Sequence, residues 1–478
     1  MIALYIVLAA IAVIIAVVII RAAAFKPRSE QKNEPEKMPV NGEAAIEHLR
    51  EFVKCKTVSS RNEAMVDEAE FDKFRELIKN LYPVVHEKCT LVRIGKSGLL
   101  YHLKGQSDKE PSVFMAHYDV VPADESAWQK PAFEGVIEDG CLWGRGTLDT
   151  KITMLGALES AEALLKEGFV PKNDMYFSFS GDEEIAGPSA PAIVDYLEEN
   201  GIKPAFVLDE GGAVVENVFP GVKGACALIG TGEKGMMDVE LTAESNGGHA
   251  SSPPPHTLVG KLSAACVKAE KKPFKTHLTA PVRQMYDTLG RHSTFVYRMI
   301  FANLWLFRPV LNMICTKSGG EMNALMRTTC AFTMMQASLA PNVLPNEARM
   351  VANLRLMGGD TTESAIEYLN KVINDDSVKI NKIHGINPSI FSRTDSPGWE
   401  NLKSAVSETW TEALVSPYLM IACSDSRHFC RISDCVYRFS AMALTKEERA
   451  SIHGNDEKIP LEKIVRTVEF YTRLMKKF

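Results

Sequence analysis

The chain has 478 residues, of which 46% are hydrophobic and 24% are charged. This balance is typical of a folded protein, and the length exceeds what one ordinary core occupies, so we expect two domains. The formal net charge of −6 gives no basic surface for nucleic acid, which we therefore exclude as a partner. The ten cysteines are scattered, and Cys423, Cys430 and Cys435 lack the paired spacing of a zinc knuckle. We interpret them as structural thiols, which leaves the cellular compartment open.

The first 20 residues contain no charged side chain. About 20 apolar residues in a helix are enough to span a lipid bilayer. A cleaved signal peptide is the alternative, because residues 22–24 resemble a cleavage site. The length of the run and the lack of a preceding Lys or Arg favour an uncleaved, single-pass anchor at residues 1–20. Lys and Arg residues follow the span, which by the positive-inside tendency favours a cytoplasmic folded part, but one span leaves the membrane side undecided.

Residues 21–40 are polar, charged and punctuated by proline, as is typical of a tether. The folded part is predicted to begin near Asn41, where apolar residues recur at helical spacing.

Strand and helix patterns alternate in the next part of the chain. Apolar runs at 112–116, 174–180 and 205–208 are typical of buried strands, and amphipathic patterns at 151–167 and 188–199 are typical of helices. This alternation predicts a three-layer α/β domain with a mostly parallel sheet, made of residues 41–234 and 387–478. Ligand sites in such sheets lie beyond the carboxyl ends of the strands.

A second unit is predicted between the two parts of the α/β domain, at residues 235–386. Residues 237–243 and 349–357 alternate apolar and polar side chains, as a half-buried antiparallel strand does. A helical pattern at 362–374 and a further strand at 378–383 follow. This inserted unit is therefore expected to have an α+β fold.

Polar motifs follow the predicted strands of the α/β domain. A carboxylate next to an imidazole can fix the ring's orientation, and a run of acids after an apolar strand is costly unless a cation compensates it. Each motif taken alone also fits a chance surface pair, a helix N-cap or a solvated acidic turn. The candidate residues are His117 and Asp119, Asp149, Glu183 and Glu184, Asp209, and His453.

The order, spacing and strand-end placement of these motifs together resemble the family of co-catalytic di-zinc exopeptidases and aminoacylases. The resemblance runs from about Asn41 to Phe478. It is closest to the carboxypeptidase S and N-fatty-acyl-amino-acid synthase/hydrolase group, whose members share an N-terminal anchor or signal and an insertion like residues 271–329. It implies a hydrolase that cleaves the amide bond of an N-acyl amino acid or small peptide with a free carboxylate. It also makes the inserted unit a lid, through which a homodimer can form.

The resemblance assigns the metal ligands. It implies two zinc ions, with cobalt or manganese as substitutes, that share a water and lower its pKa. The implied ligands are His117 and Asp209 for one ion, Glu184 and His453 for the other, and Asp149 as the bridge between them.

The resemblance also assigns roles around the metals. Asp119 would orient His117, and Glu183 would be the general base. The peptide bond after the bridging aspartate, Asp149–Thr150, is expected to be cis.

Three further residues are expected to meet the substrate. The resemblance implies that His249, on the lid, stabilises the oxyanion, often from the partner subunit. Arg355 would pair with the substrate carboxylate, although a structural salt bridge is the alternative for this arginine. His428 is predicted to line the pocket. It is also the rival of His453 as last metal ligand, and we favour His453 because Glu457 follows it at the spacing that family members show.

The insertion and the activity each leave alternatives open. Residues 295–311 are rich in large apolar side chains, which fits either lid core or subunit contact, or a wall for an acyl chain.

A serine hydrolase is disfavoured because the chain has no Gly-x-Ser-x-Gly motif. Two alternatives remain: a catalytically inactive relative that serves as a binding module, and the reverse reaction, synthesis of N-acyl amino acids.

Overall fold

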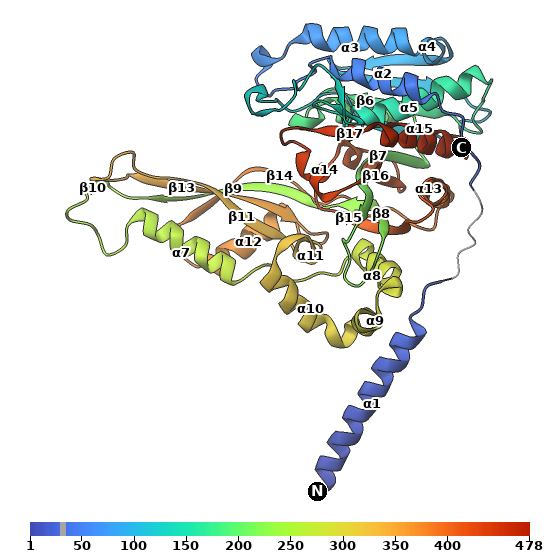
Figure 1. The fold of residues 1–478 in the computed structure, drawn as a ribbon. Helices are drawn as coiled ribbons and strands as arrows, with labels where there is room; N and C mark the ends of the chain where they lie inside the picture. Colours follow the sequence, from blue (N-terminus) through green and yellow to red (C-terminus); the bar gives the residue numbers. More distant parts are fainter. Residues whose placement is uncertain (29–34) are drawn as a thin grey trace.

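The structure is a computed structural model that describes residues 1–28 and 35–478. An α/β domain carries a second, elongated domain on one side and a protruding N-terminal helix at one end (Figure 1). The predicted mixed α/β fold is confirmed. The predicted tether, 21–40, includes positions 29–34, which lie outside the described residues.

The α/β domain is built on an eight-stranded sheet. The four central strands, β6, β3, β7 and β16, run parallel, whereas β1 and β2 form an antiparallel edge. The strand order, with bounds, is β1 (Cys89–Ile94), β2 (Gly98–Leu103), β6 (Met175–Ser180), β3 (Ser112–His117), β7 (Phe206–Glu216), β16 (Val436–Leu444), β8 (Ala225–Glu233) and β15 (Leu414–Met420).

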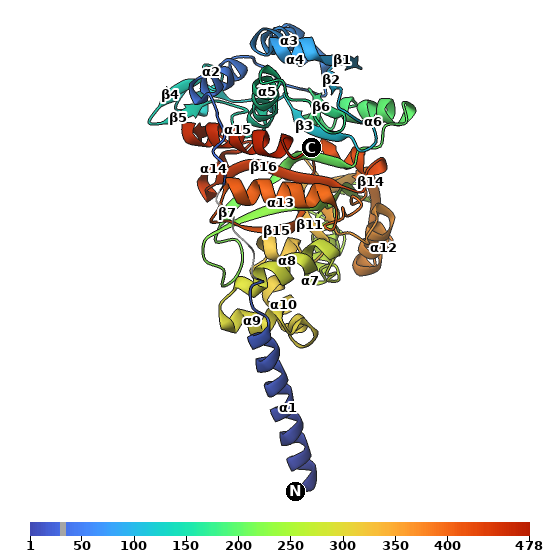
Figure 2. The same ribbon diagram turned by 90° about the vertical axis from the view of Figure 1, so that its right-hand side faces the viewer.

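Helices cover both faces of this sheet and make the predicted three layers. Alternate residues of β3 divide between the faces: Phe114 packs in the larger core, and Val113 and Met115 pack in a smaller core with α6. Figure 2 shows the helices on either side of the sheet. The larger core includes α2 (Gly42–Val53), α3 (Glu68–Leu81), α4 (Pro83–Lys88), α5 (Lys151–Lys166), α13 (Pro397–Thr409) and α15 (Leu461–Met475), and the smaller core includes α6 (Ser189–Glu199) and the 3-10 helix η4 (Asp425–Arg431).

The second domain has a four-stranded antiparallel sheet with its own core, which the helices α7 and α12 complete. Its first strand begins at Gly235 and its last ends at Ile386. A short hairpin extends the domain at its far end (Figure 1). The elements are β11 (Thr329–Gln336), β13 (Glu347–Leu356), β9 (Gly235–Glu244) and β14 (Lys379–Ile386) in sheet order, α7 (Leu258–Lys271), α12 (Thr362–Ile373), and the hairpin strands β10 (Gly248–His249) and β12 (Val343–Leu344).

Apart from Phe274 near its start, the insertion does not pack in the core of the second domain. Its helices are α8 (Ala280–His292), α9 (Phe295–Phe301), α10 (Leu304–Ser318) and α11 (Gly320–Ala324). Phe301 and Leu311 are buried in the larger core of the α/β domain, whereas Trp305 is exposed. The interpretation of residues 295–311 as lid core is therefore wrong for this chain, because α8 seats the segment against β15 instead.

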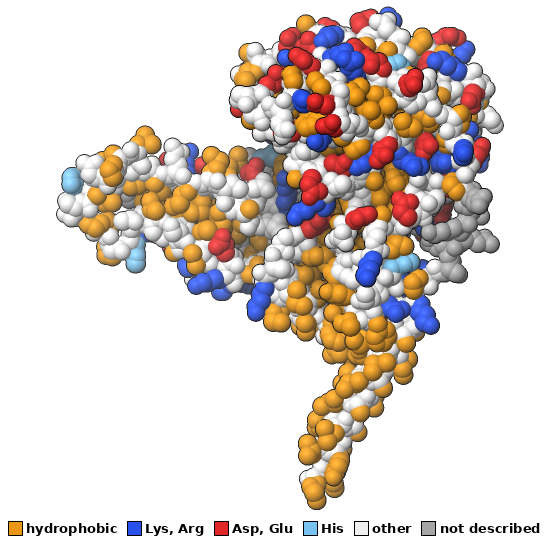
Figure 3. Space-filling model, viewed as in Figure 1, with side chains coloured by type: hydrophobic (Ala, Val, Ile, Leu, Met, Phe, Trp, Pro, Cys, Tyr) orange, Lys and Arg blue, Asp and Glu red, His pale blue; other side chains and the backbone are white. Residues whose placement is uncertain are grey.

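The N-terminal helix, α1 (Ile2–Ala24), leaves the molecule beside α9 (Figure 2). It is long and apolar enough to cross a membrane, and almost none of its surface is buried. A signal sequence has the same length and composition, so the helix supports the predicted anchor without distinguishing the two. A space-filling view shows its apolar surface continuing onto the body of the protein (Figure 3).

Candidate metal site

His117 is the last residue of β3 and begins the cluster of site residues. Its Nδ1 lies 3.0 Å from the backbone carbonyl oxygen of Asp119 and 3.3 Å from Oδ1 of the same residue. The Asp119 carboxylate also accepts the backbone N–H groups of Glu183 and Glu184, at 3.2 and 3.1 Å. Asp119 therefore connects the imidazole to the acidic turn after β6, in keeping with the orienting role predicted for it.

Asp149 lies between two imidazoles. Its Oδ1 is 3.0 Å from Nε2 of His117, and its Oδ2 is 3.1 Å from Nε2 of His453. The same nitrogen of His453 is 3.0 Å from Oε2 of Glu184. The Asp149–Thr150 peptide bond is cis, as predicted.

Glu457 fixes the loop that carries Asp149. It is fully buried and accepts the backbone N–H groups of Leu148, at 2.7 Å, and Gly146, at 3.1 Å, while Nη1 of Arg145 donates to it at 2.7 Å. The chain around Glu457 is itself held by β17 (Lys458–Pro460), which pairs with β5 (Cys141–Trp143). The C-terminal segment is thereby attached to the loop on which the two histidines converge.

His428 does not join this cluster. It lies in η4, half-buried, and burial followed by the charge of Arg427 lowers its pKa. Among the described residues it is His453 that contacts Asp149 and Glu184. His453 is thus the histidine beside these two carboxylates, and its role as a metal ligand stays a prediction.

Glu210 is a site residue that the sequence analysis missed. Its Oε1 lies 3.4 Å from Nε2 of His117. Within the described residues, two groups of side chains have ligand atoms close enough together for one ion, within 4.8 Å of one another. They are His117 with Asp149 and Glu184, and His117 with Glu183 and Glu210.

A bulge in β7 lies at Glu210, directly after Asp209. Asp209 pairs with Arg438 of β16, but the next pair is Gly212 with Phe439, so Glu210 and Gly211 have no partners across the ladder. A bulge of this kind re-aims a side chain. The Asp209 carboxylate is buried and accepts the backbone N–H of Ser426 at 3.0 Å. Geometry therefore favours Glu210 for the ligand position predicted for Asp209, which stays a prediction.

The cluster contains more acidic side chains than positively charged ones. Burial raises the pKa of Glu183 well above its usual value, and burial with the Asp149 charge raises the pKa of Glu210 to about 8. Hydrogen bonds to Asp149 and Glu184 raise the pKa of His453 to about 10. Burial opposes protonation of His117, but Glu210 and the neighbouring aspartates raise its pKa well above normal. The raised pKa values of Glu183 and Glu210 indicate an excess of negative charge that a divalent cation would neutralise.

The donor set fits such a cation. Carboxylate oxygens and imidazole nitrogens without a thiolate are the ligands of hydrolytic zinc sites. Oε1 of Glu184 is buried and has no hydrogen-bond partner among the described residues. A buried acceptor without a donor is costly, and a metal ion would remove that cost.

The two predicted lid residues lie at opposite ends of the second domain. Arg355 is near the α/β domain, on β13, where its Nη1 lies 3.6 Å from Sγ of Cys423. His249 is on β10, exposed, at the far end of the domain (Figure 1), and its Nδ1 lies 2.8 Å from Oγ of Ser251. A single chain therefore brings Arg355 toward the α/β domain but leaves His249 remote from the cluster.

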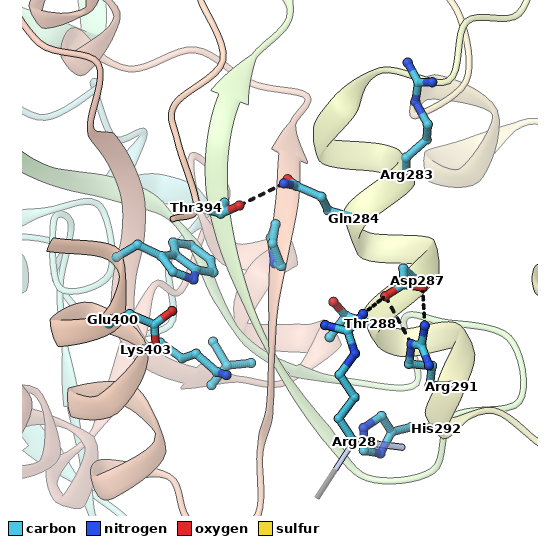
Figure 4. Close-up of a pocket in the computed structure, with 13 residues that line it drawn as sticks. Arg28, Arg283, Gln284, Asp287, Thr288, Arg291, His292, Thr394, Glu400 and Lys403 are labelled. Carbon is cyan, nitrogen blue, oxygen red and sulfur yellow. Dashed lines mark hydrogen bonds and ion pairs between the residues drawn. The ribbon is translucent and has the colours of Figure 1, made fainter. Parts of the chain in front are cut away.

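A cavity of about 520 Å³ lies apart from this cluster, between α8 and α13. Its lining includes Arg28, Arg283 and Arg291, and Asp287 makes ion pairs with two of these arginines (Figure 4). None of the predicted site residues lines it.

The fold and the cluster together define a metallopeptidase-like hydrolase, and comparison with known proteins gives the family. Residues 113–477 match the model of peptidase family M20/M25/M40, and the chain belongs to this family. Its members are metal-dependent, typically with zinc. The chain is therefore a hydrolytic enzyme that acts on amide or peptide bonds, as the resemblance implied.

The chain is similar to two groups of curated relatives. It is 37% identical to the probable carboxypeptidase S-like 2 of Dictyostelium discoideum, over 86% of this chain and 80% of the relative. It is 35% identical to the N-fatty-acyl-amino acid synthase/hydrolase PM20D1 of Xenopus tropicalis, over 90% of this chain and 85% of the relative. These are the two groups that the sequence analysis named.

Solved structures share the fold. The M20 family metallo-carboxypeptidase Sso-CP2 from Sulfolobus solfataricus superposes with a TM-score of 0.66 at 18% identity, over 90% of this chain and 98% of that one. Human carnosine dipeptidase 1 gives a TM-score of 0.61 at 14% identity, over 91% and 96% of the two chains.

The Arg145–Glu457 pair yields a stability prediction. Both side chains are buried, so Arg145→Ala leaves the Glu457 charge without its partner, and we expect the α/β domain to lose about 3–5 kcal/mol of unfolding free energy. Urea denaturation followed by tryptophan fluorescence measures the loss. The control is Arg393→Ala, which removes an exposed ion pair with Asp395 and should leave the urea midpoint unchanged. Equal midpoints for the two variants would contradict the prediction.

Proposed function

We propose that this enzyme is a zinc-dependent hydrolase that cleaves the amide bond of N-acyl amino acids or small peptides with a free carboxylate. One observation carries the proposal: the Asp149 carboxylate lies between His117 and His453, with Glu184 against the second imidazole. A carboxylate with a further candidate ligand beside each of its oxygens can be shared by two metal ions.

In this proposal five side chains hold two zinc ions, with cobalt or manganese as possible substitutes. Bound there, the ions would supply Lewis-acid chemistry and a water of lowered pKa. The proposed ligands are His117, Asp149, Glu184 and His453, together with Glu210 in the place that the sequence analysis gave to Asp209.

Glu183 is the proposed general base. One of its carboxylate oxygens lies within 4.8 Å of ligand atoms of His117 and Glu210, and burial raises the pKa of this carboxyl. It takes a proton from the attacking water and returns it to the leaving amine. Asp119 supports the step indirectly, because it holds both the His117 ring and the backbone of the Glu183 turn.

The second domain is proposed to recognise the substrate. Arg355 would pair with the free carboxylate, so that the substrate bridges the two domains. His249 would act on the oxyanion of a neighbouring subunit's site, which its distance from the cluster of its own chain supports, and this requires a homodimer through the lid (Figure 1). His428 remains a proposed lining residue of the pocket. We also propose that α1 anchors the enzyme in a lipid bilayer.

The proposed substrates are taken from those that the names of similar proteins give. The N-fatty-acyl-amino acid synthase/hydrolase of Xenopus tropicalis and the carboxypeptidase S of Saccharomyces cerevisiae are both similar to this chain over more than four fifths of its length. The first name gives an N-acyl amino acid and the second a peptide. An inactive binding module is disfavoured because the candidate base and the candidate ligands are present together. Synthesis of N-acyl amino acids would be the same reaction in reverse.

A test of this function begins with the full-length enzyme, purified in detergent with zinc. We expect it to release free amino acid from a panel of N-acyl amino acids and dipeptides, to lose activity with a chelator, and to regain it with zinc.

Glu183→Gln should keep the bound zinc and lower kcat by about 10²–10⁴-fold, because an amide cannot accept the proton of water. Zinc content and kcat on the same samples decide the point, and a near-normal kcat would remove Glu183 from the mechanism.

Glu210 and Asp209 can be separated by metal content. Glu210→Gln should lose about half of the bound zinc, because it removes one ligand of one ion. Asp209→Asn should keep both ions, since an Asn oxygen can still accept the N–H of Ser426. Atomic absorption on the two purified variants gives the answer. The reverse result would restore Asp209 as the ligand.

Arg355→Ala tests the recognition of the substrate carboxylate. We expect kcat/KM for acid substrates to fall by an amount equivalent to about 2–5 kcal/mol, with little change for the matched amides and no change in zinc. Arg349→Ala is the control, because Arg349 lies on the same strand, exposed and paired with Glu347. An equal loss for acids and amides in Arg355→Ala would give this arginine a structural role only.

A further inference from the structure

The helices α9 and α10 present an apolar surface that the α/β domain does not cover. Isolated exposed apolar side chains are ordinary, but a contiguous group of them marks an interaction site. Trp305 is 59% exposed and Val296 is 62% exposed. Figure 3 shows apolar side chains gathered at this end of the molecule. We call the following set the α9–α10 face: Phe295, Val296, Tyr297, Trp305, Leu306, Val310, Met313 and Ile314.

This face is attached to the base of α1. Nε and Nη2 of Arg21 donate to the carbonyl oxygen of Ala302, at 3.2 and 3.0 Å, and Nδ2 of Asn303 donates to the carbonyl oxygen of Val18 at 3.2 Å. The guanidinium of Arg291 lies 4.4 Å from the ring centroid of Phe25. These contacts place the α9–α10 face at the level where α1 meets the body of the protein (Figures 1 and 2).

The two helices are bent sharply rather than aligned with α1. The angle between α9 and α10 is 105°, and the bend falls at Ala302 and Asn303, the two residues that bind α1. Two helices at this angle cannot both run parallel to α1. It spreads apolar side chains sideways from the base of α1, as a segment that lies within a membrane interface does.

The charges around the face fit the headgroups of an anionic membrane. Between Phe274 and Ser318 the chain has six Lys or Arg residues and one acid, Asp287. Basic residues that flank an apolar surface are attracted by anionic lipids, and Trp and Tyr are enriched at the membrane interface. The cavity of Figure 4, with Arg28, Arg283 and Arg291 in its lining, lies on this same side of the domain, beside α8.

We propose that the α9–α10 face is a membrane-binding surface, inserted into the lipid interface next to α1. The enzyme is then held at two places, by α1 across the bilayer and by α9 and α10 within its surface. The proposal rests on α1 being retained as an anchor, which is part of the proposed function, but it does not depend on the metal site or the substrate. Continuity with α1 argues for lipid as the occupant, because any partner on this face has to fit against the membrane.

The tryptophans of this chain provide a direct test. Trp305 is the exposed one, whereas Trp128, Trp143, Trp399 and Trp410 are each less than a tenth exposed. The full-length enzyme is reconstituted into vesicles of phosphatidylcholine and phosphatidylserine, with and without bromine on the acyl chains. Bromine quenches tryptophans that contact the lipid. We expect fluorescence to fall in the brominated vesicles, and Trp305→Phe to remove more than half of that fall.

A matched control moves the reporter to the other end of the molecule. Met65 is 72% exposed and lies just before α3, far from α1 (Figure 1). A double variant, Trp305→Phe with Met65→Trp, should show no additional quenching by brominated lipid. Equal quenching at both positions would mean non-specific contact with vesicles and would overturn the proposal.

Flotation of the same samples on a density gradient separates this proposal from the anchor. An enzyme that does not float with the vesicles refutes retention of α1 in the membrane, and with it the α9–α10 proposal. An enzyme that floats, yet shows the same bromine quenching in wild type and Trp305→Phe, keeps the anchor and refutes the membrane-binding face. Concentration-dependent burial of Trp305 in that case would assign the face to a second copy of the chain.

Discussion

The position of the Asp149 carboxylate is the constraint on which the site depends. Its two oxygens contact imidazoles from β3 and from the C-terminal segment, which are more than 300 residues apart in the chain. The fully buried Glu457 holds it between them, because it accepts the backbone N–H of Asp149 itself, at 3.3 Å, and N–H groups from the loop that precedes it. The same C-terminal segment thus supplies a candidate ligand, His453, and the acid that fixes the position of Asp149.

Much of the fold and site could be predicted because the signals were local. Runs that are apolar on both faces mark buried parallel strands, and β3 and β6 lie within one residue of the predicted ranges. Asn41 precedes α2 and caps it, accepting the backbone N–H of Ala44, as its position before an amphipathic pattern indicates. Acids and histidines that directly follow such strands then meet at one edge of the sheet, as His117 and Glu184 do.

The features that sequence reasoning missed depend on pairing between distant strands. The apolar run at 205–208 makes Asp209 the acid at the end of a strand, whereas β7 continues to Glu216 through a bulge in its pairing with β16. Gly211, with a φ of +139°, was a local signal of that bulge. The apolar run at 295–311 was equally ambiguous, because its composition suits lid core, a subunit contact or a wall for an acyl chain, and only the docking of α8 on β15 shows where it packs.

The junction between the domains connects the site, the lid and the insertion. A single residue, Lys234, separates β8 from β9, and the chain returns from the second domain directly beside it, since a Cβ on Gly235 would lie 2.5 Å from the carbonyl oxygen of Ile386. The buried Lys234 ammonium donates to the carbonyl oxygens of Ala324 and Arg327, at 2.9 and 2.8 Å. The Lys234 side chain therefore links the junction between the two domains to the end of the insertion. The hydroxyl of Thr328 links the same end to the second domain, because it accepts the backbone N–H of Met357 at 2.8 Å.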